Sequence, residues 1–314
     1  LSFLYIQRQK NPSTPNAIPR QIISEPHAMQ AISENVRLQG TRLAVVMTMG
    51  ALHEGHISLV TLARKSADTV IMTLFVNPTQ FSAGEDLERY PRPFEQDVAH
   101  AEAAGVDYLF APTAAEMYPA GHQTSVQCGA LAERFEGAHR SGHFNGVATV
   151  VTKLLHITKP HTAIFGEKDA QQLAIIRQLV ADLLIDVEII GAPIVREADG
   201  LAKSSRNVYL SSNERKRATV LYGGLCHAKA RLAEGEQNLQ QIATEVEALI
   251  TATEGCTIDY VAFVDEATFL PIEQADAGKR YRLLLAVRLG SVRLIDNMVM
   301  RNEISSYKSN GLSN

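Results

Sequence analysis

The sequence has few cysteines, and none of them is paired at a spacing typical of a metal site. Its 314 residues include only Cys128, Cys226 and Cys256, an odd number with no C-x-x-C spacing. This pattern argues against a disulfide framework and disfavours a metal site, so the three are predicted to be reduced thiols. The chain also lacks an internal repeat and a low-complexity block.

Long apolar runs and an excess of positive charge are missing as well. The most apolar stretch, residues 173–190, is interrupted by charged side chains and falls short of the ~20 apolar residues that cross a bilayer. Residues 1–10 carry their charges after their apolar residues, the reverse of a signal peptide. The 30 Lys and Arg against 34 Asp and Glu give a net charge of −4, which disfavours a nucleic-acid-coating protein. We therefore expect a cytoplasmic protein with no membrane partner and no nucleic-acid partner.

The composition is that of a chain that can form an extensive hydrophobic core. Hydrophobic residues make up 46% and charged residues 20%, which excludes disorder of the whole chain. The length allows two domains. Prolines concentrated in residues 1–20 and polar residues at the other end predict tails over 1–20 and 301–314.

Between residues 21 and 194, short apolar runs alternate with segments of helical spacing. Such runs are typical of strands buried on both faces, and the alternation is typical of β-α-β units. The predicted strands are 43–47, 70–76, 106–110, 162–165 and 187–190, and helices are predicted around 57–63 and over 94–104, 147–157 and 170–184. This pattern predicts an α/β fold, a doubly wound parallel-sheet (Rossmann-like) domain over 21–194.

The pattern changes beyond Pro193. Two helical segments precede three segments that alternate like antiparallel strands, with a tight-turn signal at Gly290-Ser291. The helices are predicted over 211–233 and 239–251, and the strands over 257–264, 281–289 and 292–299. We predict a smaller α+β domain over residues 195–300.

The segment after the first predicted strand has features of an anion-binding site. It reads Met-Gly-Ala-Leu-His-Glu-Gly-His over residues 49–56, which puts His53 and His56 three residues apart at a helix start. A helix N-terminus offers free N–H groups to a phosphate, and glycines allow close approach. Capping and packing of the histidines is an equal alternative at this point. A metalloprotease-like metal site is disfavoured because the two histidines are not four residues apart. Neither a P-loop nor a G-x-G-x-x-G pattern follows a strand.

Four motifs in order give the chain a family resemblance. Residues 49–56 resemble the HIGH signature of the nucleotidyltransferase superfamily. They are followed by Phe-Val-Asn-Pro-Thr-Gln-Phe at 75–81 with Asp-Leu-Glu-Arg-Tyr-Pro-Arg at 86–92, Phe-Gly-Glu-Lys-Asp-Ala-Gln-Gln-Leu at 165–173, and Ala-Asp-Gly-Leu-Ala-Lys-Ser-Ser-Arg-Asn at 198–207. Together, from about residue 21 to 300, they resemble the pantoate–β-alanine ligase (pantothenate synthetase) family. One departure is Lys203, which stands where many members carry Met.

The resemblance implies an ATP-dependent ligation of pantoate and β-alanine to pantothenate, with release of AMP and diphosphate through a pantoyl-adenylate intermediate. It implies catalytic roles for His53, His56, Lys168 and Arg206, with His56 donating toward the leaving diphosphate. Gln80 and Gln172 are expected to bind pantoate, and Asn77 to lie near the second substrate. The implied ATP-binding residues are Met49, Gly50, Ala51, Leu52, His53, Glu54, Gly55, His56, Gly166, Glu167, Lys168, Asp169, Val195, Lys203, Ser204, Ser205 and Arg206.

The resemblance also implies Mg²⁺ with the ATP and a homodimer. No set of metal ligands stands out in the sequence, and Asp97 is only a weak candidate. In the implied arrangement, the second domain closes over ATP through residues 203–206.

The chemistry of the residues agrees with such a reaction. Transfer of AMP to a carboxylate supplies a leaving group, and this displacement needs positioned cations and N–H donors rather than a side-chain nucleophile. Neutral glutamines suit a substrate with hydroxyl and carboxylate oxygens. Ser204 and Ser205 have no Asp/His partner nearby in sequence, and 215–217 is predicted to be a solvated helix face.

Three alternatives remain open from the sequence. Glycines around His139 and His143 predict a surface turn over 137–146, with a flexible cover of the active site as the second interpretation. A nucleotidyltransferase that leaves the nucleotide on its product is the nearest rival enzyme. A nucleotide-binding regulator without catalysis is the rival from another class, although the intact histidine, lysine and arginine motifs argue against it.

Overall fold

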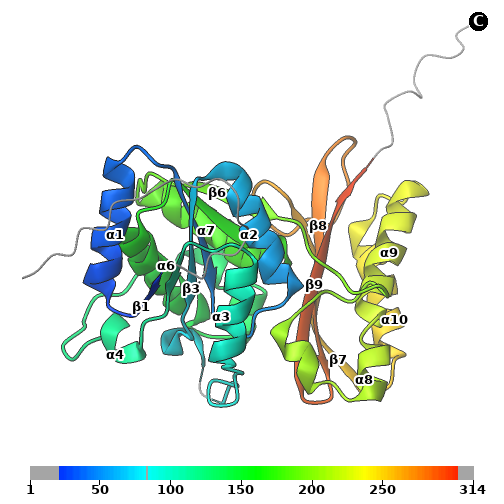
Figure 1. Cartoon of the computed structure of the whole chain (residues 1–314). Coiled ribbons are helices and arrows are strands. Elements are labelled where there is room, and N and C mark those ends of the chain that lie inside the picture. The colour runs from blue at the N-terminus through cyan, green and yellow to red at the C-terminus, as the bar shows by residue number, and fades with distance from the viewer. Residues whose placement is uncertain (1–20, 83, 303–314) are drawn as a thin grey trace, which may run out of the picture.

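The first part of the chain folds around a parallel β-sheet (Figure 1). The structure, a computed structural model, describes residues 21–82 and 84–302. Six strands in these residues pair in the order β1-β4-β3-β2-β5-β6, and every pair is parallel. The predicted parallel sheet is confirmed. The strands are β1 (Gln21–Ile23), β2 (Leu43–Thr48), β3 (Thr69–Leu74), β4 (Tyr108–Phe110), β5 (Thr162–Gly166) and β6 (Glu188–Ala192).

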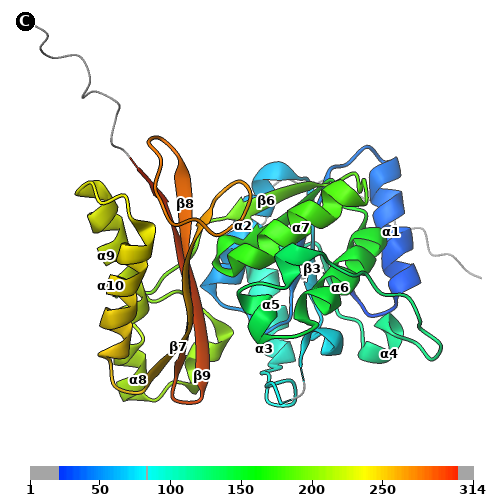
Figure 2. The ribbon, with the colours of Figure 1, turned by 180° about the vertical axis from the view of Figure 1, so that it is seen from behind.

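Helices cover both faces of this sheet over two separate hydrophobic cores. Leu43 and Val45 of β2 contribute to the core under α1, α6 and α7, whereas Ala44 and Val46 contribute to the core under α2 and α3. Successive side chains of a strand point to opposite faces, which explains why β2 and β3 are nearly continuous apolar runs. Figure 1 shows α2 and α3 on one face, and Figure 2 shows α6 and α7 on the other. The bounds are α1 (Pro26–Leu38), α2 (Glu54–Ser66), α3 (Phe94–Ala103), α6 (His143–Thr158) and α7 (Ala170–Asp182).

The second part consists of a three-stranded antiparallel sheet with helices on one face. The strands pair in the order β7-β8-β9, and α9 and α10 bury their apolar sides against them in a third core. The opposite face of this sheet is turned toward the parallel-sheet part (Figure 1). The predicted fold class of this smaller unit, α+β, is confirmed. Its elements are α8 (Ser212–Arg217), α9 (Val220–Ala233), α10 (Leu239–Thr251), β7 (Cys256–Asp265), β8 (Arg280–Leu289) and β9 (Val292–Arg301).

Short helices complete the connections between these elements. They are α4 (Ala114–Met117), α5 (Glu136–His139), η1 (Pro78–Gln80), η2 (Ala130–Ala132), η3 (Glu167–Asp169) and η4 (Ser205–Tyr209). Among the helices of the described residues, none is long and apolar enough to span a bilayer.

Several sequence predictions differ from the structure. The prediction of a surface turn over 137–146 is wrong for its last residues, because His143 and Gly146 belong to α6 and are buried. The single helix predicted over 211–233 is two helices, α8 and α9, and neither β1 nor α1 was expected. The predicted tail over 1–20 lies outside the described residues. Of the predicted tail 301–314, Arg301 ends β9, and residues 303–314 lie outside the described residues. A domain boundary at 194/195 stays a prediction.

Gly146→Ala is expected to lower the free energy of unfolding by about 1–3 kcal/mol. A Cβ on this residue of α6 would lie 2.2 Å from the carbonyl oxygen of Thr79 in η1, so the two elements would have to move apart. The matched control is Gly223→Ala in α9, where nothing lies within 4 Å of the new Cβ. Alanine's higher helix propensity should make the control neutral or stabilising by up to ~1 kcal/mol. Chemical denaturation measures both variants, and equal stabilities would contradict the packing of α6 on η1.

Candidate active site

A cavity of about 240 Å³ lies at the carboxyl ends of β2, β3 and β5, beside α6. Parallel strands bring their following loops to this edge, where ligands bind in open α/β sheets. The structure brings most of the predicted site residues together here. Those that line the cavity are Met49, His53, Gly55, His56, Asn77, Gln80, Gly166, Lys168, Asp169, Gln172, Val195, Lys203, Ser204, Ser205 and Arg206.

Five predicted nucleotide contacts do not line the cavity: Gly50, Ala51, Leu52, Glu54 and Glu167. Leu52 is buried in the core under α2. The carboxylate of Glu54 forms an ion pair with Lys203. Glu167 faces β8, where its carboxylate lies 3.2 Å from the guanidinium of Arg282.

Asp97 anchors the loop after β2. Its side chain is 3% exposed, and its two carboxylate oxygens accept the N–H groups of Ala51 (2.8 Å) and Leu52 (2.7 Å). Ala51 has a positive φ of 51°, an uncommon conformation for a residue with a Cβ, which these bonds help to hold. These bonds give Asp97 a structural role, and the suggestion that it binds Mg²⁺ stays a prediction. No cluster of metal-ligating side chains occurs in residues 21–82 and 84–302.

The two histidines after β2 are neutral hydrogen-bond donors. The N–H of Gly55 donates to Nδ1 of His53 (3.1 Å), and the N–H of His53 donates to Nδ1 of His56 (3.3 Å). Because each Nδ1 accepts, each neutral ring carries its proton on Nε2. Burial, with a smaller effect of Lys168 and Lys203, lowers the pKa of His53 to about 4. Burial followed by His53 and Lys168 lowers the pKa of His56 to about 3. Both rings are thus uncharged at neutral pH.

Two lysines approach this edge of the cavity from different parts of the chain. Lys168 belongs to η3, directly after β5, and its Nζ lies 4.0 Å from the Asp169 carboxylate. Lys203 comes from the segment beyond β6 and forms ion pairs with Glu54 and Glu197, which raise its pKa. Lysine ammonium groups at the ends of parallel strands provide positive charge for a phosphate chain.

The amide side chains on the cavity wall differ in how many bonds they already make. The Asn77 amide is 1% exposed and donates to Gln80 Oε1 (3.2 Å) and to the Gly146 carbonyl (3.1 Å), while its oxygen accepts from Tyr118 (2.8 Å). Asn77 therefore orients Gln80 and joins η1 to α6. Gln172, on the first turn of α7, lines the same cavity.

Tyr90, Arg140 and His143 also line the cavity and were not predicted as functional residues. His143 Nδ1 lies 2.7 Å from the Gln80 carbonyl, and Arg140 donates to its Nε2 at 3.0 Å, so the ring is neutral with its proton on Nδ1. Burial and Arg140 lower the pKa of His143 to about 4. The Tyr90 hydroxyl lies 3.2 Å from the Ser205 hydroxyl. The sequence signal for His143 is its four-residue spacing from His139, but the glycines around the two histidines predict a surface turn.

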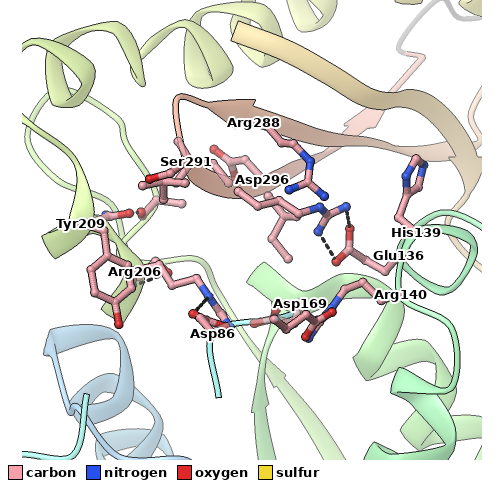
Figure 3. A pocket seen from close by; sticks show the side chains of 18 of the residues that line it. Asp86, Glu136, His139, Arg140, Asp169, Arg206, Tyr209, Arg288, Ser291 and Asp296 are labelled. Carbon is pink, nitrogen blue, oxygen red and sulfur yellow. Dashed lines mark hydrogen bonds and ion pairs between the residues drawn. The ribbon is translucent and has the colours of Figure 1, made fainter. Parts of the chain in front are cut away.

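A second cleft of about 460 Å³ adjoins the cavity between the two parts of the chain (Figure 3). Arg206 binds Asp86 through two hydrogen bonds of 2.9 Å, and Arg140 binds Glu85 at 2.8 and 2.7 Å. Two adjacent carboxylates of one segment thus hold two arginines at the mouth of the site. The predicted catalytic residue Arg206 lies in both spaces.

The arrangement is suited to a displacement on a polyanion. Neutral N–H donors and cationic side chains surround one end of the cavity. There they can stabilise the negative charge that develops on ligand oxygens during the displacement. No histidine lies within hydrogen-bond distance of Ser204 or Ser205 among the described contacts, so a serine nucleophile of the triad type has no base.

Comparison with known proteins places this site in a family. The family model for pantoate–β-alanine ligase matches residues 21–299. A pantothenate synthetase of Chlorobium chlorochromatii (strain CaD3) is 96% identical over 288 residues, which are 92% of this chain and 99% of that relative. One of Pelodictyon phaeoclathratiforme is 66% identical and covers 88% of this chain and 98% of the relative.

Solved structures of two relatives share the fold. A pantothenate synthetase of Thermus thermophilus is 44% identical with a TM-score of 0.82, covering 88% of this chain and 98% of that one. A pantoate–β-alanine ligase of Francisella tularensis, complexed with beta-gamma ATP and β-alanine, is 34% identical with a TM-score of 0.72 over 88% and 97% of the two chains. On these matches, which span nearly all of the residues that the structure describes, the chain belongs to the pantoate–β-alanine ligase family.

Proposed function

We propose that this ligase makes its amide in two steps, through a pantoyl adenylate, in the cavity at the ends of β2, β3 and β5. The overall reaction, which joins pantoate and β-alanine with the use of ATP, follows from the family. The observation that carries the two-step route is the pair of neutral imidazoles beside Lys168, in a cavity with no activated nucleophile. The Francisella relative complexed with beta-gamma ATP and β-alanine supports binding of a nucleotide and of the amine by this chain.

In the first step, a carboxylate oxygen of pantoate forms a bond to the α-phosphorus of ATP. The bond from this phosphorus to the bridging oxygen breaks, and the electron pair leaves with the diphosphate. His53, His56 and Lys168 donate to the phosphate oxygens on which this charge accumulates, with His56 and Lys168 nearest the leaving diphosphate. Such preorganised donors stabilise the transition state more than the substrate.

In the second step, the amine of β-alanine attacks the acyl carbon, the C–O bond to AMP breaks, and the amine loses a proton. Gln80 and Gln172 are proposed to hold the pantoyl oxygens through both steps. Asn77 is proposed to lie near the second substrate. Because its own amide is fully bonded, its proposed role is to keep Gln80 in place. Arg206, Ser205 and Val195 are proposed to close over ATP from the second part of the chain.

Mg²⁺ is proposed as part of the ATP substrate rather than as a resident of this chain. Magnesium is commonly held by phosphates and water with only one or two carboxylates. The described residues include no carboxylate cluster for it, and both oxygens of Asp97 are engaged by backbone N–H groups. A homodimer and a cytoplasmic location also stay predictions, supported by the family resemblance.

The two-step route predicts a burst of diphosphate before any amide forms. With ATP and pantoate but without β-alanine, rapid quench should detect about one diphosphate per site, followed by a stall with the adenylate bound. His56→Ala and Lys168→Ala should slow this burst by ~10²–10³, the usual effect of removing one preorganised donor. Given synthetic pantoyl adenylate and β-alanine, both variants should form the amide at nearly the normal rate.

The matched controls are His100→Ala on α3 and Lys216→Ala on α8, which remove the same groups far from the cavity and should keep the normal burst. No burst without the amine would favour a concerted route. If the variants slow amide formation from the adenylate as much as they slow the diphosphate burst, His56 and Lys168 shape the whole pocket and do not act specifically on the leaving diphosphate. A product that keeps its nucleotide would identify the rival nucleotidyltransferase.

The proposed donors should stay neutral down to pH ~5. Nitrogen-15 NMR of the imidazoles, assigned with His53→Ala and His56→Ala, should give titration midpoints near the lowered pKa values of about 4 and about 3, with the proton on Nε2. In the urea-unfolded chain, the same rings should titrate near ~6.5. Because the unfolded state binds these protons first, stability should fall as the pH drops from ~6.5 toward ~4. Midpoints near ~6.5 in the folded chain would contradict the neutral-donor mechanism.

A further inference from the structure

Two successive residues of β9, Asp296 and Asn297, are almost fully buried although both are polar. They are 3% and 2% exposed; Asn297 contacts η3, and Asp296 lines the second cleft. Burying such groups is unfavourable unless their hydrogen bonds are satisfied. Their partners are therefore informative about what the two side chains do.

Asn297 binds the backbone of the segment that carries Lys168. Its amide Nδ2 donates to the carbonyl oxygens of Glu167 and Lys168, both at 2.9 Å. Its Oδ1 accepts from Arg282, which also forms the ion pair with the Glu167 side chain. One amide thus fixes two successive carbonyls of η3. Since η3 has no side-chain cap of its own, this contact determines how its backbone presents Lys168 to the cavity.

Asp296 binds the segment that carries Lys203. Its carboxylate pairs with Arg196 through two bonds of 2.6 and 2.9 Å, and Arg196 also donates to the carbonyls of Gly200 (2.9 Å) and Asn297 (3.2 Å). Arg196 forms an isolated antiparallel bridge with Ala202, directly before Lys203. The 195–203 turn is closed by the N–H of Lys203, which donates to Val195 O at 2.9 Å.

The geometry points to Asp296 and Asn297 as a pair of positioning residues for the adenylation step. We propose that this dipeptide sets the spacing of the Lys168 and Lys203 segments around the ATP phosphates. Each residue acts through one lysine segment, and the rigid strand β9 joins them. The proposal rests on the proposed role of the two lysines in binding ATP. A displacement of about 1 Å in such a site can cost about 100-fold in rate.

Crossed double-mutant cycles test the pair, with the diphosphate burst as readout. Asn297→Ala should slow the burst roughly 10- to 100-fold in the parent chain and in a Lys203→Ala chain, but less than about 3-fold in a Lys168→Ala chain. Asp296→Asn should slow the burst in the parent chain and in a Lys168→Ala chain, but its effect should be lost in a Lys203→Ala chain. Amide formation from synthetic pantoyl adenylate should change by less than about 3-fold in either single variant.

A structural role alone would give a different pattern. Glu245→Gln is the control, because Glu245 joins α10 to Arg231 and His227 of α9 and is remote from the lysine segments. It should lower the melting temperature without slowing the burst. If Asn297→Ala does not fold, Asn297→Asp serves instead, since it keeps the side-chain size but removes both amide donors.

The same factor for Asn297→Ala in all three backgrounds would overturn the proposal. A normal burst in Lys168→Ala itself would instead contradict the proposed function of that lysine, so the two failures are distinguishable.

Discussion

The site depends on the parallel arrangement of β3, β2 and β5, which are neighbours in the sheet. Parallel neighbours end at the same edge, so three loops far apart in sequence meet there. The loop after β2 brings the imidazole pair, the segment after β3 brings Asn77 and Gln80, and η3 after β5 brings Lys168. None of these loops forms the cavity alone. The helices on both faces supply the buried surface that keeps the strands in this register.

The polar residues of the cavity differ in charge. The two imidazoles are partly buried and neutral, so their contacts with nearby lysines carry no charge repulsion. Positive charge is supplied by Lys203, Arg206 and Lys168. Lys203 and Arg206 already have carboxylate partners, Glu54 and Asp86, so phosphates would compete with these pairs. Lys168 has only the 4.0 Å contact with Asp169 among the described ion pairs and is the cation most readily available to an incoming anion.

The sequence predicted the parts of the fold that depend on local pattern. The runs at β2 and β3 are buried on both faces, so their continuous apolar residues were sufficient to predict the strands, and the motifs after them identified several of the residues that line the cavity. The segment of α1 buries Met29, Ser33 and Val36, which lie at regular helical spacing, yet no helix was expected there. Gly146 suggested a turn, yet it lies inside α6 because only glycine fits against Thr79.

Long-range polar contacts could not be predicted in this way. Asp97 was considered as a metal ligand, but its partners are backbone groups of the loop after β2, and no local pattern encodes that contact. Glu167 is expected at the nucleotide, and its carboxylate also pairs with Arg282 on the other sheet, a contact that the motif did not indicate. Both cases follow from contacts between elements that come together only in the folded chain.

The central claim is that this cavity transfers the adenylyl group of ATP to the carboxylate of pantoate. Pantoate labelled with ¹⁸O at both carboxylate oxygens tests it directly by mass spectrometry of the products. Attack on the α-phosphorus followed by loss of AMP predicts one ¹⁸O in the AMP and one retained in the pantothenate amide carbonyl. Unlabelled AMP, with ¹⁸O in diphosphate or phosphate instead, would contradict the account.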